Sequence, residues 1–175
     1  MKCIFLDFDG VINNCYHFDG VCPTNALILK QIIDLTNAKI VVTSSNKYSI
    51  QQKNKVDYHK TIFYKNYVQP LSELGIEIHD ITPFCNRDRT LEIQKYLIDN
   101  KIKEFVIIDD ELVSEPLQEH QVFCDLYRGL QIKHIEPILN ILNGKLGFYL
   151  ETYNRQETSS ELILRINRYY NTQKQ

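Results

Sequence analysis

Short apolar runs alternate with longer amphipathic stretches along most of this chain. The short runs, rich in β-branched residues, predict five strands: Lys2 to Phe8, Lys39 to Thr43, Ile76 to Ile81, Glu104 to Ile108 and Val122 to Cys124. The longer stretches, with apolar residues at i, i+3 and i+4, predict helices over 23–36, 89–100 and 132–142 and shorter helical pieces within 47–74. This alternation favours an α/β fold with a doubly wound, Rossmann-like, mainly parallel sheet flanked by helices.

Three further patterns refine that prediction. Asp19-Gly20, a favoured tight-turn pair, predicts a small hairpin flap over 11–22 after the first strand. The segments after the first and second strands contain no obvious extra domain, so we expect no cap domain. Near the end of the chain, the capping-box sequence Thr158-Ser159-Ser160-Glu161 precedes apolar residues at helical spacing. We therefore expect one domain over 1–145 and a C-terminal extension over 146–175, whose helix packs on the core or begins a further region.

Composition narrows the classes of protein that remain. The chain has 175 residues, 43% hydrophobic and 24% charged, and its formal net charge of -2 provides no general attraction to nucleic acid or anionic membranes. No apolar run approaches the roughly 20 residues of a membrane span, and the N-terminus does not resemble a signal peptide. The five scattered cysteines form no C-x-x-C pair, which favours reduced thiols. We expect a cytoplasmic protein, or one secreted into a host cytosol if it is an effector.

The main chemical signal follows the first strand. Asp7 and Asp9 are spaced i, i+2, so an extended chain places both side chains on the same side, and Gly10 permits a sharp turn directly afterwards. The carboxyl edge of a parallel sheet is where such folds bind ligands. Two close carboxylates repel each other unless a cation or a shared proton intervenes. The pattern indicates a metal site, a nucleophile with an acid/base partner, or both.

Three later stretches add to this signal. The second strand ends in Thr43-Ser44-Ser45, Arg87 and Arg89 precede or begin a helix, and the fourth strand ends in Asp109-Asp110. If the first, second and fourth strands are close neighbours, these groups meet in one crevice. Either Thr43 or Ser44 would then bind a phosphoryl oxygen, with Thr43 favoured because it ends the strand directly. Arg89 is favoured over Arg87 because it leads into the helix.

The order of nucleophile, hydroxyl, cation and acidic pair resembles the four motifs of the haloacid dehalogenase (HAD) superfamily, most of whose members are magnesium-dependent phosphatases. The resemblance implies that Asp7 forms an aspartyl-phosphate and that Asp9 is the general acid and base. It implies that Thr43, with Ser44 as the alternative, and Arg89 bind phosphate; HAD proteins mostly carry Lys at the last position. The implied Mg²⁺ ligands are Asp7, Asp9 through its main-chain carbonyl, Asp109 and Asp110.

Within the superfamily, the chain is similar to small HAD domains of "Swiss Army knife" RNA-repair proteins from about Lys2 to Leu142. The similar segments include Ile4-Phe5-Leu6-Asp7-Phe8-Asp9-Gly10-Val11, Ile40-Val41-Val42-Thr43-Ser44-Ser45 and Val106-Ile107-Ile108-Asp109-Asp110. Those relatives usually have Trp-Arg after the serines, where this chain has Asn46-Lys47. Compact effector phosphatases with a similar core act on phosphotyrosine.

A capless site is open, and open sites suit phosphates on macromolecules. We therefore predict a magnesium-dependent phosphatase acting on a phosphotyrosine protein or a nucleic-acid end; the sequence provides no evidence for a stable nucleic-acid complex. The alternatives are a catalytically silent HAD-fold binding module and a phosphatase of small nucleotides. A receiver-type signalling domain and a nucleotide-sugar transferase fit less well, because their motif order or chain length differs. The segment 58–67 mixes bases with aromatic residues and predicts an amphipathic helix or a base-stacking surface.

Overall fold

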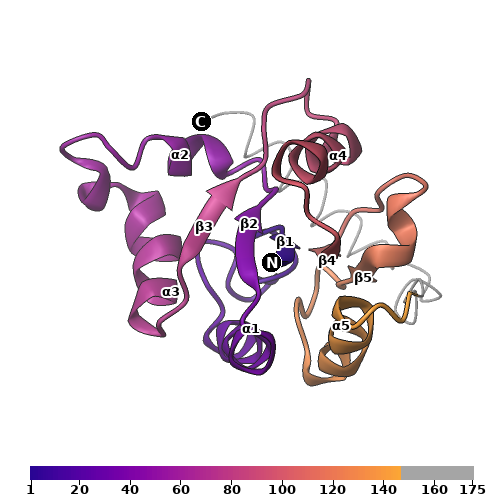
Figure 1. The fold of residues 1–175 in the computed structure, drawn as a ribbon. Helices are drawn as coiled ribbons and strands as arrows, with labels where there is room; N and C mark the ends of the chain where they lie inside the picture. Colours follow the sequence, from indigo (N-terminus) through magenta and orange to yellow (C-terminus); the bar gives the residue numbers. More distant parts are fainter. Residues whose placement is uncertain (147–175) are drawn as a thin grey trace, which may run out of the picture.

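A single five-stranded parallel sheet organises the protein in the computed structural model, which describes residues 1–146 (Figure 1). Its strand order is β3-β2-β1-β4-β5. The strands are β1 (Lys2–Leu6), β2 (Lys39–Val42), β3 (Ile78–Ile81), β4 (Glu104–Asp109) and β5 (Gln121–Phe123). This arrangement confirms the predicted doubly wound α/β fold and places β1 between β2 and β4, as the convergence of the site residues requires.

Helices flank the sheet on both sides. The α-helices are α1 (Pro23–Thr36), α2 (Lys47–Gln51), α3 (Gln69–Glu73), α4 (Arg89–Asn100) and α5 (Ile135–Leu142). The other helical segments are η1 (Tyr58–Lys60), η2 (Tyr64–Val68), η3 (Leu117–His120) and η4 (Ile132–His134). Figure 1 shows α1 and α5 together on one side of the sheet and α4 on the other.

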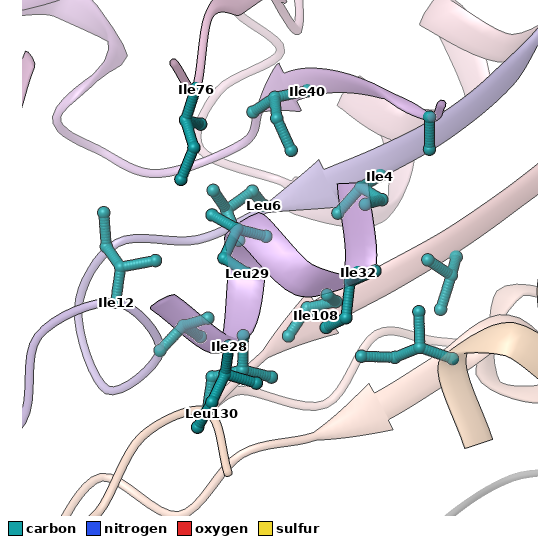
Figure 2. Packing of buried hydrophobic residues seen from close by; sticks show 14 of the residues in the cluster. Ile4, Leu6, Ile12, Ile28, Leu29, Ile32, Ile40, Ile76, Ile108 and Leu130 are labelled. Carbon is teal, nitrogen blue, oxygen red and sulfur yellow. The ribbon is translucent and has the colours of Figure 1, made fainter. Parts of the chain in front are cut away.

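The alternation of side chains along the strands explains the two layers. Ile4 and Leu6 of β1 lie in a buried cluster with residues of α1 and α5, whereas Cys3 and Phe5 lie in a second cluster with residues of α4. Figure 2 shows the first cluster, in which Leu29 of α1 lies close to the strand residues. Because both faces of β1 are buried, its sequence is continuously apolar rather than alternating.

Local signals position the two longest helices. Proline at the start of α1 has the backbone angle that a first helical turn needs, and the helix ends at Asn37 in the left-handed conformation. The Asp88 side chain caps α4 by accepting a hydrogen bond from the Leu91 N–H at 3.0 Å. This cap fixes the start of α4 at Arg89, beside the ends of the strands.

Two local predictions were wrong. Residues 11–22 form turns with an isolated antiparallel bridge between Asn14 and His17, not a two-stranded hairpin flap. The Asn13 side chain contacts the Asp9 carboxylate, the Gly10 amide and the Tyr67 hydroxyl, so these contacts and backbone hydrogen bonds of turns, rather than a strand ladder, hold this segment. The segment 58–67 is not one amphipathic helix, because the isolated turn η1 is separated from the helical segment that contains η2.

The remaining segments bear on the cap and on the chain end. Within residues 1–146, turns and short helices occupy 43–77, and no separate domain interrupts the sheet. The helix predicted after Thr158 and the extension over 146–175 lie almost wholly outside the described residues, so that division of the chain stays a prediction. None of the helices in the described part is both long enough and apolar enough to span a bilayer.

Candidate active site at the carboxyl edge of the sheet

Backbone hydrogen bonds extend beyond the strands and align the groups predicted to form the site. The Asp7 amide donates to the Ile108 carbonyl at 3.0 Å, and the Thr43 amide donates to the Leu6 carbonyl at 2.9 Å. Asp109 is the last residue of β4, and its carbonyl accepts from the Cys124 amide at 2.9 Å. The ends of the three central strands are therefore in register, and the side chains that follow them meet at the same edge.

Three carboxylates converge there. One oxygen from each of Asp7, Asp109 and Asp110 lies within 4.8 Å of the other two. Asp7 and Asp109 are buried, at 3% and 0% exposure, whereas Asp110 is partly exposed. Burial raises the pKa of Asp109 to about 7, although the neighbouring Arg89 lowers it. Such a cluster needs a positive charge close by to stay fully ionised at neutral pH.

Arg89 supplies one positive charge. Its guanidinium forms an ion pair with Asp109 and lies 3.3 Å from the Asp7 Oδ2. Burial lowers the pKa of Arg89, but the charges of Asp7 and Asp109 outweigh burial and leave that pKa well above its usual range. Arg87 is exposed and has a left-handed backbone with φ of 64°. The structure thus brings Arg89, and not Arg87, into contact with the acidic cluster.

Two buried oxygen atoms at this edge lack hydrogen-bond partners among the described residues. They are the Asp7 Oδ1 and the Thr43 Oγ1. Ser44 is also buried, but its hydroxyl accepts a hydrogen bond from the Asn46 amide at 3.3 Å. Because buried polar atoms are almost always satisfied, the two orphaned oxygens mark where an additional polar group would bind.

Asp9 occupies a different position from the three clustered acids. Its carboxylate accepts hydrogen bonds from the Asn13 side chain at 2.7 Å and from the Asn46 side chain at 3.4 Å. Gly10 has φ of +69°, and a Cβ there would lie 2.3 Å from the Asp110 Oδ2. The turn at Gly10, directly after the two acids of the motif, therefore lets Asp110 approach the main chain.

The sequence did not reveal a buried ion pair next to the site. Lys47 Nζ lies 2.5 Å from Glu92 Oε2, and both side chains are nearly inaccessible. The same ammonium donates to the Thr82 hydroxyl at 3.1 Å and to the Pro83 carbonyl at 2.9 Å. Burial lowers the pKa of Lys47, and its contact with Glu92 opposes that shift. One available signal was that Glu92 immediately precedes Ile93, at the start of the apolar face of α4.

A cavity of about 410 Å³ lies elsewhere, along the free edge of β3. None of the predicted site residues lines it. The acidic cluster lies instead at the carboxyl edge of the sheet.

This fold and this set of groups are those of a HAD-type domain. More specifically, a family model described as the HAD domain in Swiss Army Knife RNA repair proteins matches residues 3–135, and the chain belongs to that family. No curated protein and no solved structure matches the chain.

The residues present fit a magnesium ion, which HAD proteins generally use. All the side-chain donors are carboxylate oxygens, the ligands that Mg²⁺ prefers, and Asp7 Oδ1 is buried without a protein partner in the described part of the chain. The side chain of Asp9 lies outside the group of three carboxylates. Its expected contribution is a main-chain carbonyl, which stays a prediction.

Proposed function

We propose that this protein is a Mg²⁺-dependent phosphomonoester phosphatase that works through an aspartyl-phosphate on Asp7. The observation that carries this proposal is the pair of orphaned buried oxygens, Asp7 Oδ1 and Thr43 Oγ1, beside the Arg89 guanidinium. A phosphoryl group bound there accepts a hydrogen bond from the Thr43 hydroxyl and ion pairs with Arg89. A bound phosphoryl group would therefore pair both with the Thr43 hydroxyl and with the Arg89 guanidinium.

In the first step, an Asp7 carboxylate oxygen attacks phosphorus. The bond from phosphorus to the ester oxygen breaks, and protonated Asp9 gives its proton to that leaving oxygen. In the second step, a water molecule attacks the same phosphorus while Asp9 takes a proton from it. The bond between Asp7 and phosphorus breaks, inorganic phosphate leaves and both carboxyl groups return to their starting states.

The contacts around Asp9 suit this double role. Asn13 and Asn46 hold its carboxyl group through hydrogen bonds, and that group is not one of the three clustered acids, so in the proposed reaction it serves the leaving group rather than the metal ion. Asp7, Asp109, Asp110 and the Asp9 carbonyl would hold Mg²⁺, which when bound neutralises part of the negative charge of the acids and the phosphate. Arg89 adds a second, permanent positive charge at the Asp7 side chain.

The proposed substrate is an exposed phosphate on a macromolecule, either a phosphotyrosine protein or a nucleic-acid end. The lack of an inserted cap domain among residues 1–146 supports this choice, because in HAD enzymes such a cap encloses small substrates. The matching family is that of HAD domains in RNA repair proteins, which supports the nucleic-acid end. A catalytically silent binding module is the competing function, and turnover distinguishes the two. A cytoplasmic location stays a prediction.

Hydrolysis of p-nitrophenyl phosphate tests the proposal. We expect turnover with Mg²⁺, loss of turnover with EDTA, and at least a 10³-fold lower kcat for Asp7→Asn, since a covalent step disappears. Asp99→Asn, which changes an exposed acid on α4 paired with Lys95, is the matched control and should keep wild-type activity. Activity of Asp7→Asn at the wild-type level would exclude the aspartyl-phosphate.

A second pair of variants tests which hydroxyl binds phosphate. Thr43→Val removes the orphaned hydroxyl with little change in shape, and we expect it to lower kcat/KM by about 10- to 100-fold, the value of one hydrogen bond to a charged group. Ser44→Ala removes a hydroxyl that is already paired with the Asn46 amide, and its effect should be several-fold smaller. The reverse order would assign phosphate binding to Ser44.

A further inference from the structure

An exposed pair of aromatic rings lies at the same edge of the sheet as the proposed phosphatase site. Tyr48 is in α2, which follows the end of β2, and Phe84 is in the loop that follows β3. Their ring centroids are 4.2 Å apart, with the ring planes inclined by 32°. Tyr48 is 55% exposed and Phe84 is 37% exposed. Two contacting rings that remain this exposed form a small apolar platform in water.

The buried Lys47 holds the platform in place. The Lys47 ammonium lies 4.7 Å from the centroid of the Phe84 ring and donates to the carbonyl of the neighbouring Pro83 at 2.9 Å. Lys47 is itself held by Glu92 at 2.5 Å. The Lys47 ammonium attracts the face of the Phe84 ring, and its contacts with Glu92 and Pro83 hold it in place. Phe84, and Tyr48 in contact with it, are therefore preorganised for binding.

The platform also lies on the side where the leaving group must be. Asn46, which contacts the Asp9 carboxylate at 3.4 Å, is two residues before Tyr48. In the proposed reaction Asp9 protonates the leaving oxygen, so the body of the substrate extends from Asp9. Asn46 therefore connects Asp9 to the helix that carries Tyr48, and in a nucleotide a sugar separates the leaving oxygen from the base. In a phosphotyrosine the ring is bonded directly to the leaving oxygen, which places it closer to Asp9.

We propose that the Tyr48–Phe84 platform binds the terminal nucleobase of a single-stranded nucleic acid whose end phosphate is the substrate. This inference rests on the proposed phosphatase function and specifies its substrate. Every base presents a flat π-face, so stacking on such a platform tolerates any sequence. The exposed Arg87 lies in the same loop as Phe84 and provides a positive charge on this side of the site for the next backbone phosphate.

The test compares two end-phosphorylated RNA hexamers that differ only in the terminal nucleotide, which carries a base in one and is abasic in the other. For the wild-type protein with Mg²⁺ we expect kcat/KM to be about tenfold higher on the hexamer with the base. Tyr48→Ala should lower kcat/KM on this hexamer by about the same factor, mainly by raising KM, and should change kcat/KM little on the abasic hexamer. Tyr48→Phe keeps the ring and should match the wild type. Ile98→Ala, at an apolar residue of α4 that is 75% exposed, is the control and should change neither value.

The outcomes separate this inference from the function on which it rests. If Tyr48→Ala lowers kcat/KM equally on both hexamers, or on neither, the base-stacking role is wrong, although the phosphatase function stands. If Tyr48→Ala instead lowers kcat/KM on a phosphotyrosine peptide, the platform binds a protein substrate and the inference is overturned. If the wild-type protein hydrolyses no phosphomonoester, the proposed function fails. Equilibrium binding of the two hexamers, measured by fluorescence anisotropy, then decides the inference: a tenfold preference that Tyr48→Ala removes supports it, and equal affinities refute it.

Discussion

The buried ion pair between Lys47 and Glu92 makes a quantitative prediction about stability. Lys47→Met keeps most of the length and volume of the side chain but removes the ammonium, so the Glu92 carboxylate, 4% exposed, loses its charge partner. Only the Cys85 amide, at 3.2 Å from Oε1, remains as a hydrogen-bond donor to that carboxylate among the contacts described. Breaking a buried pair in this way costs about 3–5 kcal/mol. Since small domains are stable by about 5–15 kcal/mol, the variant should be severely destabilised.

Urea unfolding followed by circular dichroism measures this loss. We expect the free energy of unfolding to fall by about 3–5 kcal/mol for Lys47→Met and by a somewhat smaller amount for Glu92→Gln, which leaves the ammonium with the Thr82 and Pro83 oxygens. The double variant should be no less stable than Lys47→Met alone, because no unpaired buried charge remains. A double-mutant cycle should therefore give a coupling of about 2 kcal/mol or more.

An exposed pair provides the control for this cycle. Lys30 and Asp34 form an i, i+4 pair on α1 whose side chains are 31% and 58% exposed. Lys30→Met should change the stability by less than about 0.5 kcal/mol, because water screens such pairs. The reasoning would be refuted if Lys47→Met had an effect as small as Lys30→Met, or if the two substitutions at Lys47 and Glu92 were additive.

Two further predictions concern acid stability and the turn at Gly10. His134 is 5% exposed, and burial lowers its pKa from 6.5 to about 4, so the unfolded chain binds a proton more strongly than the folded one. The stability that His134 contributes should be fully present above pH 6.5 and should be lost as the pH falls toward 4, by up to about 3 kcal/mol. Urea unfolding at several pH values measures this loss as the difference in pH slope between the wild type and His134→Gln. Equal slopes would refute the prediction. Gly10→Ala should raise the Mg²⁺ concentration needed for half-maximal phosphatase activity at least severalfold, because the new Cβ would lie 2.3 Å from the Asp110 Oδ2. Gly75 has a similar positive φ, but a Cβ there would meet only the Lys30 side chain, at 3.7 Å. Gly75→Ala should therefore share the backbone strain without the change in Mg²⁺ dependence. Equal Mg²⁺ requirements in the two variants would contradict the role of the Gly10 turn.

The chain's local patterns were sufficient for the framework of the fold. The predicted helices at 23–36 and 89–100 coincide with α1 and α4, because apolar periodicity is a local signal. The five strands are found within about two residues of their predicted ends. Strands that are apolar throughout must be buried on both faces, which restricts the chain to a parallel sheet covered by helices. The positions of Asp7, Thr43 and Asp109 follow from this framework, since each comes directly after or at the end of a central strand.

Contacts between distant segments decided the rest. The Asp-Gly turn predicted a hairpin, but the Asn13 side chain binds Asp9, Gly10 and Tyr67, and the segment folds around those contacts. Thr43 and Ser44 are adjacent and both buried, and only the tertiary structure shows which hydroxyl lacks a partner. Lys47 has the sequence context of a surface residue, yet Glu92 makes its burial tolerable. Periodicity reports which side of an element is apolar, whereas the satisfaction of a buried polar group depends on partners supplied by other parts of the chain.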